Sequence, residues 1–118
     1  MRRDPATWLE DILTHGREAL TFIEGKSEAD YVADRGLQAM VERKLFIVGE
    51  AVSQIGSVFP EIGAQLSDKR EIVGFRNLLA HAYFALDHKR VYDIARNSLP
   101  ALVDEAERLL GSIEEQGQ

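Results

Sequence analysis

A single apolar stripe in residues 37 to 59 constrains the fold of this chain more than any other feature. Its members recur every three or four residues, which is the spacing that places side chains on one face of an α-helix. They are Leu37, Val41, Leu45, Val48, Val52, Ile55 and Phe59. A long helix with one apolar face needs other helices to cover that face, and Pro60 prevents its continuation.

The rest of the chain carries the same helical periodicity, interrupted by residues that begin or end helices. Gly25 ends the first helix, because glycine readily closes a helix C-terminus. The helix-start signals are Asp4-Pro5, Ser27-x-x-Asp30, Ser67 or Asp68, Asp87, and Ser98 with Pro100. No segment alternates apolar and polar residues as a half-buried strand does. The predicted fold class is therefore all-α, an up-down bundle of about four to five helices.

Size and composition indicate one globular domain. The chain is 45% hydrophobic and 29% charged, close to globular averages, so residues 1–118 are expected to form a single domain. Its last stretch, 110–118, ends in polar residues and is expected to fray. Because the chain has no cysteine, no signal-peptide pattern and no long apolar run, it is predicted to act in the cytoplasm, without a membrane.

Charge is unevenly distributed along this acidic chain. The net charge of −6 argues against a general nucleic-acid binder. Residues 69–90 nevertheless contain five basic and two acidic side chains, a balance of +3 that leaves −9 for the remainder. This basic region contains an unusual stretch, F-R-N-L-L-A-H-A-Y, at residues 75–83.

Four polar side chains interrupt this otherwise apolar stretch: Arg76, Asn77, His81 and Tyr83. On a helix with about 100° per residue, Arg76 and His81 lie about 140° apart, whereas Tyr83 returns to within about 20° of Arg76. One straight helix therefore cannot aim Arg76 and His81 at the same point. Two copies related by a two-fold axis would place His81 of one copy near Arg76 of the other, so a homodimer is expected.

Arginine and histidine together suit the cleavage of RNA without a metal or another cofactor. Histidine exchanges a proton near neutral pH, and a guanidinium binds the phosphoryl oxygens of the linkage that breaks. Asn77 could orient the phosphate or the imidazole. The three histidines lack the H-x-x-x-H spacing of a metal site, so no metal is expected. Spacing alone leaves a structural alternative open, in which the same residues form a surface salt bridge, a helix cap and a half-buried phenol.

Three segments resemble the HepT-like toxins, a branch of the HEPN superfamily. R-N-L-L-A-H-A-Y, residues 76–83, matches their Arg-x4-His-x-Tyr motif. Residues 31–51 are similar to the family's long helix with its I-G-E-A signature, which reads V-G-E-A here. Residues 91–102 resemble the segment that follows the motif, so the resemblance covers residue 4 to about residue 110.

The resemblance implies a homodimeric ribonuclease that acts as the toxin of a type VII-like toxin–antitoxin pair. Arg76 and His81 would then be catalytic, and Tyr83 would accept AMP. A partner antitoxin, a nucleotidyltransferase of the MntA type, would transfer that AMP from ATP, and its charge and bulk would exclude RNA. The alternative is a non-catalytic helical adaptor that docks a nucleotidyltransferase and helps to bind a nucleotide or substrate. The acidic net charge favours the adaptor slightly, because it repels RNA.

Two further residues have open interpretations. Glu50 lies among apolar residues in I-V-G-E-A-V, where an unpaired carboxylate would be costly. It either hydrogen-bonds Arg76 and holds that side chain in place, or lies on a solvent face or at the dimer interface. His88, together with Lys89 and Arg90, either attracts the RNA backbone or forms a solvated cap-and-charge cluster.

Overall fold

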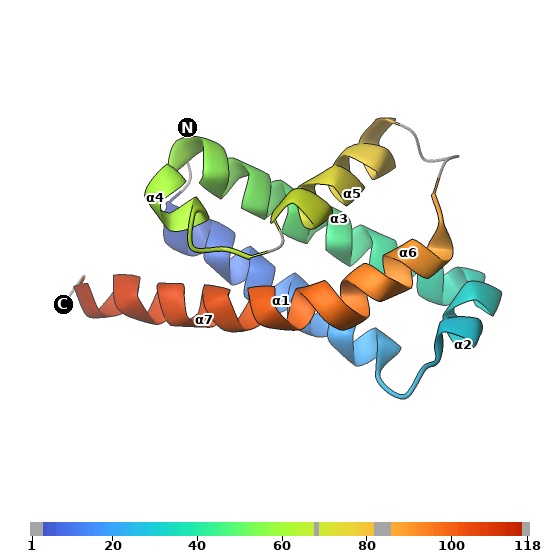
Figure 1. Cartoon of the computed structure of the whole chain (residues 1–118). Helices are drawn as coiled ribbons and strands as arrows, with labels where there is room; N and C mark the ends of the chain where they lie inside the picture. Colours follow the sequence, from blue (N-terminus) through green and yellow to red (C-terminus); the bar gives the residue numbers. More distant parts are fainter. Residues whose placement is uncertain (1–3, 68, 82–85, 117–118) are drawn as a thin grey trace.

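The computed structural model describes residues 4–67, 69–81 and 86–116, and every regular element within these ranges is a helix. Helix α3 (Arg35–Val58) is the longest of them. Helices α1 (Pro5–Ile23) and α5 (Lys69–His81) pack against α3, and α7 (Leu99–Gln116) packs along α1 (Figure 1). The prediction of an all-α bundle is confirmed.

The apolar stripe of α3 forms the centre of the core. Leu45, Val48 and Ile55 have no exposed surface. Full burial of one aliphatic side chain contributes about 1.5–3 kcal/mol, so a stripe of this length strongly favours one orientation of α3. The helix ends before proline as predicted, and Pro60 instead begins the short helix α4 (Pro60–Gly63).

The first two helices start at the residues that the sequence predicts. The Asp4 carboxylate accepts a hydrogen bond from a backbone N–H of the first turn at 2.8 Å, and Pro5 is the first residue of α1. Ser27 and Asp30 form a reciprocal capping box at α2 (Glu28–Ala33). The backbone N–H and the hydroxyl of Ser27 hold the pKa of the Asp30 carboxyl below its ordinary value.

A wide helical turn joins the last two helices. Helix α6 (His88–Asp93) continues through the π-helical turn η2 (Ile94–Ser98) directly into α7. The sequence predicts a new helix start near Ser98 and Pro100, and the structure differs by running on without a break. Proline has no N–H for the carbonyl four residues earlier, and the wider turn accommodates that missing bond.

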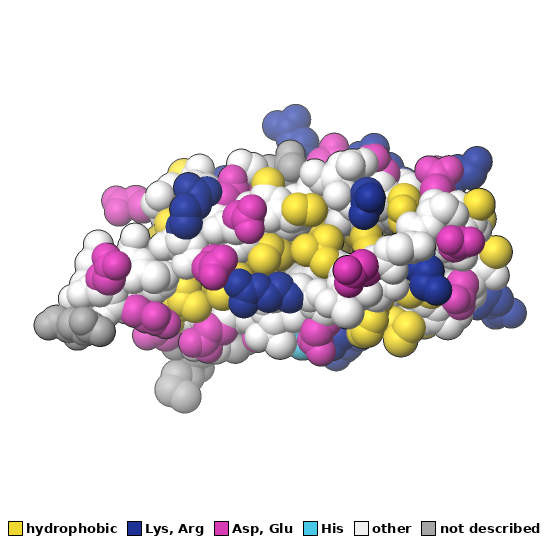
Figure 2. Space-filling model, turned by 90° about the horizontal axis from the view of Figure 1, so that it is seen from below, with side chains coloured by type: hydrophobic (Ala, Val, Ile, Leu, Met, Phe, Trp, Pro, Cys, Tyr) yellow, Lys and Arg dark blue, Asp and Glu magenta, His cyan; other side chains and the backbone are white. Residues whose placement is uncertain are grey.

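The face of the molecule away from α5 displays much of the acidic charge. Figure 2 shows this face from below, with hydrophobic side chains gathered near the middle and many acidic side chains around them. Helices α1 and α7 lie on this side in Figure 1. No helix in the described ranges is long and apolar enough to cross a membrane.

Candidate active site

Arg76 lies in the second half of α5 and faces α3. Its Nε and Nη2 atoms donate to the same carboxylate oxygen of Glu50, over 2.8 and 2.6 Å. The two side chains are 26% and 29% exposed, so the pair is reachable from solvent. Two charge-assisted contacts from one guanidinium fix its orientation as well as its position.

Gly49 permits this contact because it lets the two helices approach closely. An added Cβ at Gly49 would lie 2.6 Å from the Arg76 Cβ and 3.1 Å from the carbonyl oxygen of Ile72. A larger residue would therefore push α5 away from α3. Gly49 thus allows the approach, and Glu50 beside it binds the guanidinium.

Three more side chains surround the ion pair. Asn77 accepts a hydrogen bond from Arg76 Nη1 at 3.0 Å, and Gln54 donates to the other oxygen of Glu50 at 3.2 Å. The Arg76 guanidinium lies over the ring of Phe46, 5.6 Å from the ring centre. Phe46 and Gln54 were not predicted from the sequence, although both lie four residues from Glu50 and so share its helix face.

The guanidinium keeps hydrogen-bonding capacity for a ligand. Of its five N–H groups, three are directed to Glu50 and Asn77. The other two, one on each Nη atom, have no partner among the residues that the structure describes. Arginine binds phosphate and carboxylate oxygens through such groups, so Arg76 can hold an anion while Glu50 holds Arg76.

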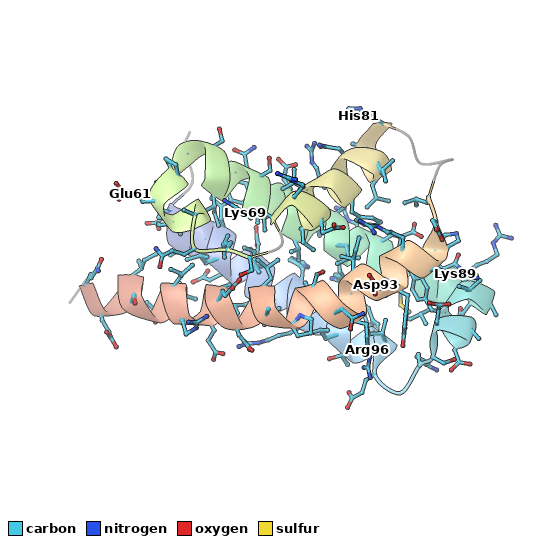
Figure 3. All side chains as sticks on the ribbon, in the orientation of Figure 1. Glu61, Lys69, His81, Lys89, Asp93 and Arg96 are labelled. Atoms are coloured by element: carbon cyan, nitrogen blue, oxygen red, sulfur yellow. The ribbon has the colours of Figure 1, made fainter. Side chains whose placement is uncertain are left out.

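His81 is the last residue of α5, and its side chain is exposed. It projects away from the bundle (Figure 3) and forms no hydrogen bond or ion pair within the described ranges. Because α5 is continuous from Arg76 to His81, the two side chains are separated by about 140° around the helix. One chain therefore brings Arg76, Asn77 and Glu50 together and leaves His81 apart. Tyr83 lies outside the described residues.

A second carboxylate of α3 faces the start of the next helix. The Glu42 side chain is only 6% exposed, and its Oε2 atom lies 3.5 Å from Nδ1 of His88, the first residue of α6. The Tyr31 ring packs edge-on against the imidazole of His88. His88 is thus turned inward, whereas Lys89 projects outward (Figure 3). Glu42 was not predicted from the sequence as a site residue.

The third histidine lies at a different place. His15 is half-buried between α1 and α3, where its Nδ1 lies 3.3 Å from Lys44 Nζ and 3.5 Å from Glu18 Oε1. Lys44 and Glu50 are on different faces of α3, since six residues rotate a helix by about 240°. Within the described part of the chain, no three His, Cys, Asp or Glu side chains are arranged to hold a metal ion.

The fold and the motif together define a class of protein. An all-α bundle that carries an Arg-x4-His motif on one helix is HEPN-like. Residues 12–109 match the family described as "Ribonuclease HepT-like". The chain belongs to this family.

Several relatives carry ribonuclease names. "Probable ribonuclease HepT" of Thermococcus cleftensis is 31% identical over 113 residues, which cover 92% of this chain and 98% of the relative. "Putative RNase MJ0125" of Methanocaldococcus jannaschii is 28% identical over 114 residues, which cover 97% of each chain. No solved structure shows a significant match.

Proposed function

We propose that this protein is an endoribonuclease toxin that acts in the cytoplasm as a homodimer and cleaves RNA without a metal. The observation that carries the proposal is the Arg76 guanidinium, held by Glu50 and Asn77 with two N–H groups left for a phosphate. Membership of the HepT-like ribonuclease family supports RNA as the substrate.

The chemistry needs no external nucleophile. The 2′-hydroxyl oxygen of a ribose attacks the adjacent phosphorus, and the bond from phosphorus to the 5′-oxygen breaks. The products are a 2′,3′-cyclic phosphate and a free 5′-hydroxyl. His81 mediates the passage of the proton from the 2′-oxygen to the 5′-oxygen, and Arg76 stabilises the charge on the phosphoryl oxygens.

Two copies complete each site in this proposal. The angular separation on α5 keeps His81 away from the Arg76 of its own chain. A two-fold axis beside α5 places His81 of one copy next to Arg76 of the other, and the same arrangement repeats on the opposite side of the axis.

Cleavage of RNA by the purified protein in the presence of EDTA tests this function. We expect Arg76→Ala and His81→Ala each to slow cleavage by about 10²- to 10⁴-fold. The first removes the group that stabilises charge on the phosphoryl oxygens, and the second removes the group that transfers the proton. Arg96→Ala is the matched control, since Arg96 is exposed and lies on the side of the molecule opposite His81 (Figure 3). A wild-type protein that binds a nucleotidyltransferase but cuts no RNA would favour the adaptor function instead.

Silencing by a nucleotidyltransferase antitoxin of the MntA type is the second part of the proposal. The phenol oxygen of Tyr83 attacks the α-phosphorus of ATP, pyrophosphate leaves, and the phenol proton is released. The tyrosyl adenylate adds a negative charge and bulk, which would repel and exclude RNA. With the cognate antitoxin, ATP and Mg²⁺, mass spectrometry should show one AMP on Tyr83, and Tyr83→Phe should stay active. An adenylate found on another residue contradicts this part.

A further inference from the structure

A hollow lies between α3 and α5, on the side of the Phe46 ring. It has a volume of about 340 Å³ and is lined by Ala39, Glu42, Arg43, Phe46 and Leu79. Ligand pockets have volumes of about 300–1,000 Å³, so a hollow of this size suits a flat ring system more than a whole nucleotide. We propose that it binds one unstacked nucleobase of the RNA, next to the phosphate held by Arg76. This inference rests on the proposed function.

Phe46 connects the hollow to the candidate active site. Its ring lines the hollow and also lies under the Arg76 guanidinium, at 5.6 Å. A phosphate on Arg76 and a base in the hollow are therefore close enough to belong to neighbouring groups of one RNA strand. Aromatic faces stack on every base, and sequence-reading proteins commonly hold unstacked RNA bases this way.

The residues beside the hollow follow one face of α3. Ala39, Arg43, Phe46 and Glu50 are separated by four, three and four residues, the spacing of a single helix face. From Arg43 to Glu50 the helix rises by about 10 Å, which is the scale of one to two nucleotides. One face of α3 thus carries, in order, the cation Arg43, the aromatic ring of Phe46 and the carboxylate of Glu50 that binds Arg76.

The charges around the hollow favour a polyanion. Arg43 is exposed and forms no ion pair within the described ranges, whereas Arg76 is paired with Glu50 and Arg90 with Glu71. Glu42 lines the hollow, faces the imidazole of His88 and is almost fully buried. The free charge at the rim is therefore positive, and it can contact a phosphate or stack on the base.

Binding of a short 2′-O-methyl RNA tests the inference, because this RNA has no 2′-hydroxyl and cannot be cut. One abasic position is moved along the strand, and the dissociation constant is measured by fluorescence anisotropy. For wild type we expect one position at which loss of the base weakens binding by about 5- to 150-fold. In Phe46→Leu that difference should fall to about threefold or less, since leucine keeps the packing and removes the stacking face.

Arg43→Gln should weaken binding of every RNA. It should also reduce the slope of log affinity against log salt concentration by about one charge, and Arg96→Gln should change neither quantity.

Comparing abasic with intact RNA in each variant cancels any general disturbance of Arg76 by Phe46→Leu. Equal binding at all abasic positions, or the same profile in wild type and Phe46→Leu, overturns the subsite. Occupation of the hollow by a second copy would produce that result. The cleavage assay with 2′-hydroxyl RNA judges the ribonuclease function separately.

Discussion

Glu50 contacts Arg76 through one oxygen and Gln54 through the other, so a single carboxylate orders both of its neighbours. Asn77 contacts the far side of the same guanidinium. An arginine held in this way binds a phosphate with less loss of side-chain entropy than a free one. We therefore propose that Glu50 positions Arg76 and does not itself react.

Glu50→Gln tests this role at the level of the residue. We expect kcat for RNA cleavage to fall by about 10- to 100-fold, because Arg76 loses its charged partner and its fixed orientation. The free energy of unfolding should change by about 1 kcal/mol or less, since both side chains are partly exposed. Steady-state kinetics and urea denaturation measure the two quantities. Glu61→Gln is the control, because Glu61 is exposed on α4, at the other end of the molecule from His81 (Figure 3). An unchanged kcat in Glu50→Gln would mean that Asn77 and Phe46 alone are enough to orient Arg76.

At the scale of helices, the approach of α5 to α3 decides whether the site forms. Gly49→Ala should lower the free energy of unfolding by about 1–3 kcal/mol, because the new Cβ meets α5 backbone and the stem of Arg76. The rate of RNA cleavage by Gly49→Ala should fall as well. Gly56→Ala on the same helix is the matched control, since nothing lies within 4 Å of the added Cβ. There alanine should stabilise the helix by up to about 1 kcal/mol. Equal stability of the two variants would contradict the close approach at Gly49.

Features of the fold that have a local cause could be predicted from the sequence. The caps at Asp4 and Ser27 follow from side chains that bond to their own first turn. The face that α3 buries also follows from the spacing of its apolar residues. The partners of Glu42 and Phe46 could not be predicted in this way, because they depend on where α5 and α6 cross α3. The path of the chain through Ile94–Ser98 likewise depends on packing between helices.

At the scale of the whole molecule, the proposed two-copy site can be tested with mixed dimers. Arg76→Ala and His81→Ala are each expected to be inactive as homodimers. A heterodimer of the two contains one site with both side chains intact and one site with neither. Random mixing should therefore restore about a quarter of wild-type activity.

Co-expression of the two variants with different affinity tags, followed by purification on both tags, provides the measurement. Purified heterodimers should show about half of wild-type cleavage, because one of two sites works. A mixture of Arg76→Ala with itself under a second tag is the control. If no activity returns, Arg76 and His81 act within one chain, and the two-copy site is wrong.

The wide turn at Ile94–Ser98 determines what happens when one residue is deleted from this part of the chain. A π turn contains one residue more than an α turn, so removing a single residue there would tighten it. The result would be an ordinary α turn that completes the same full rotation, so α6 and α7 would keep their orientation about the common axis. Removing one residue from the regular part of α7 would instead rotate the helices on either side of the deletion by about 100° relative to each other. A deletion within Ile94–Ser98 should therefore leave Val91 buried and His88 facing Glu42.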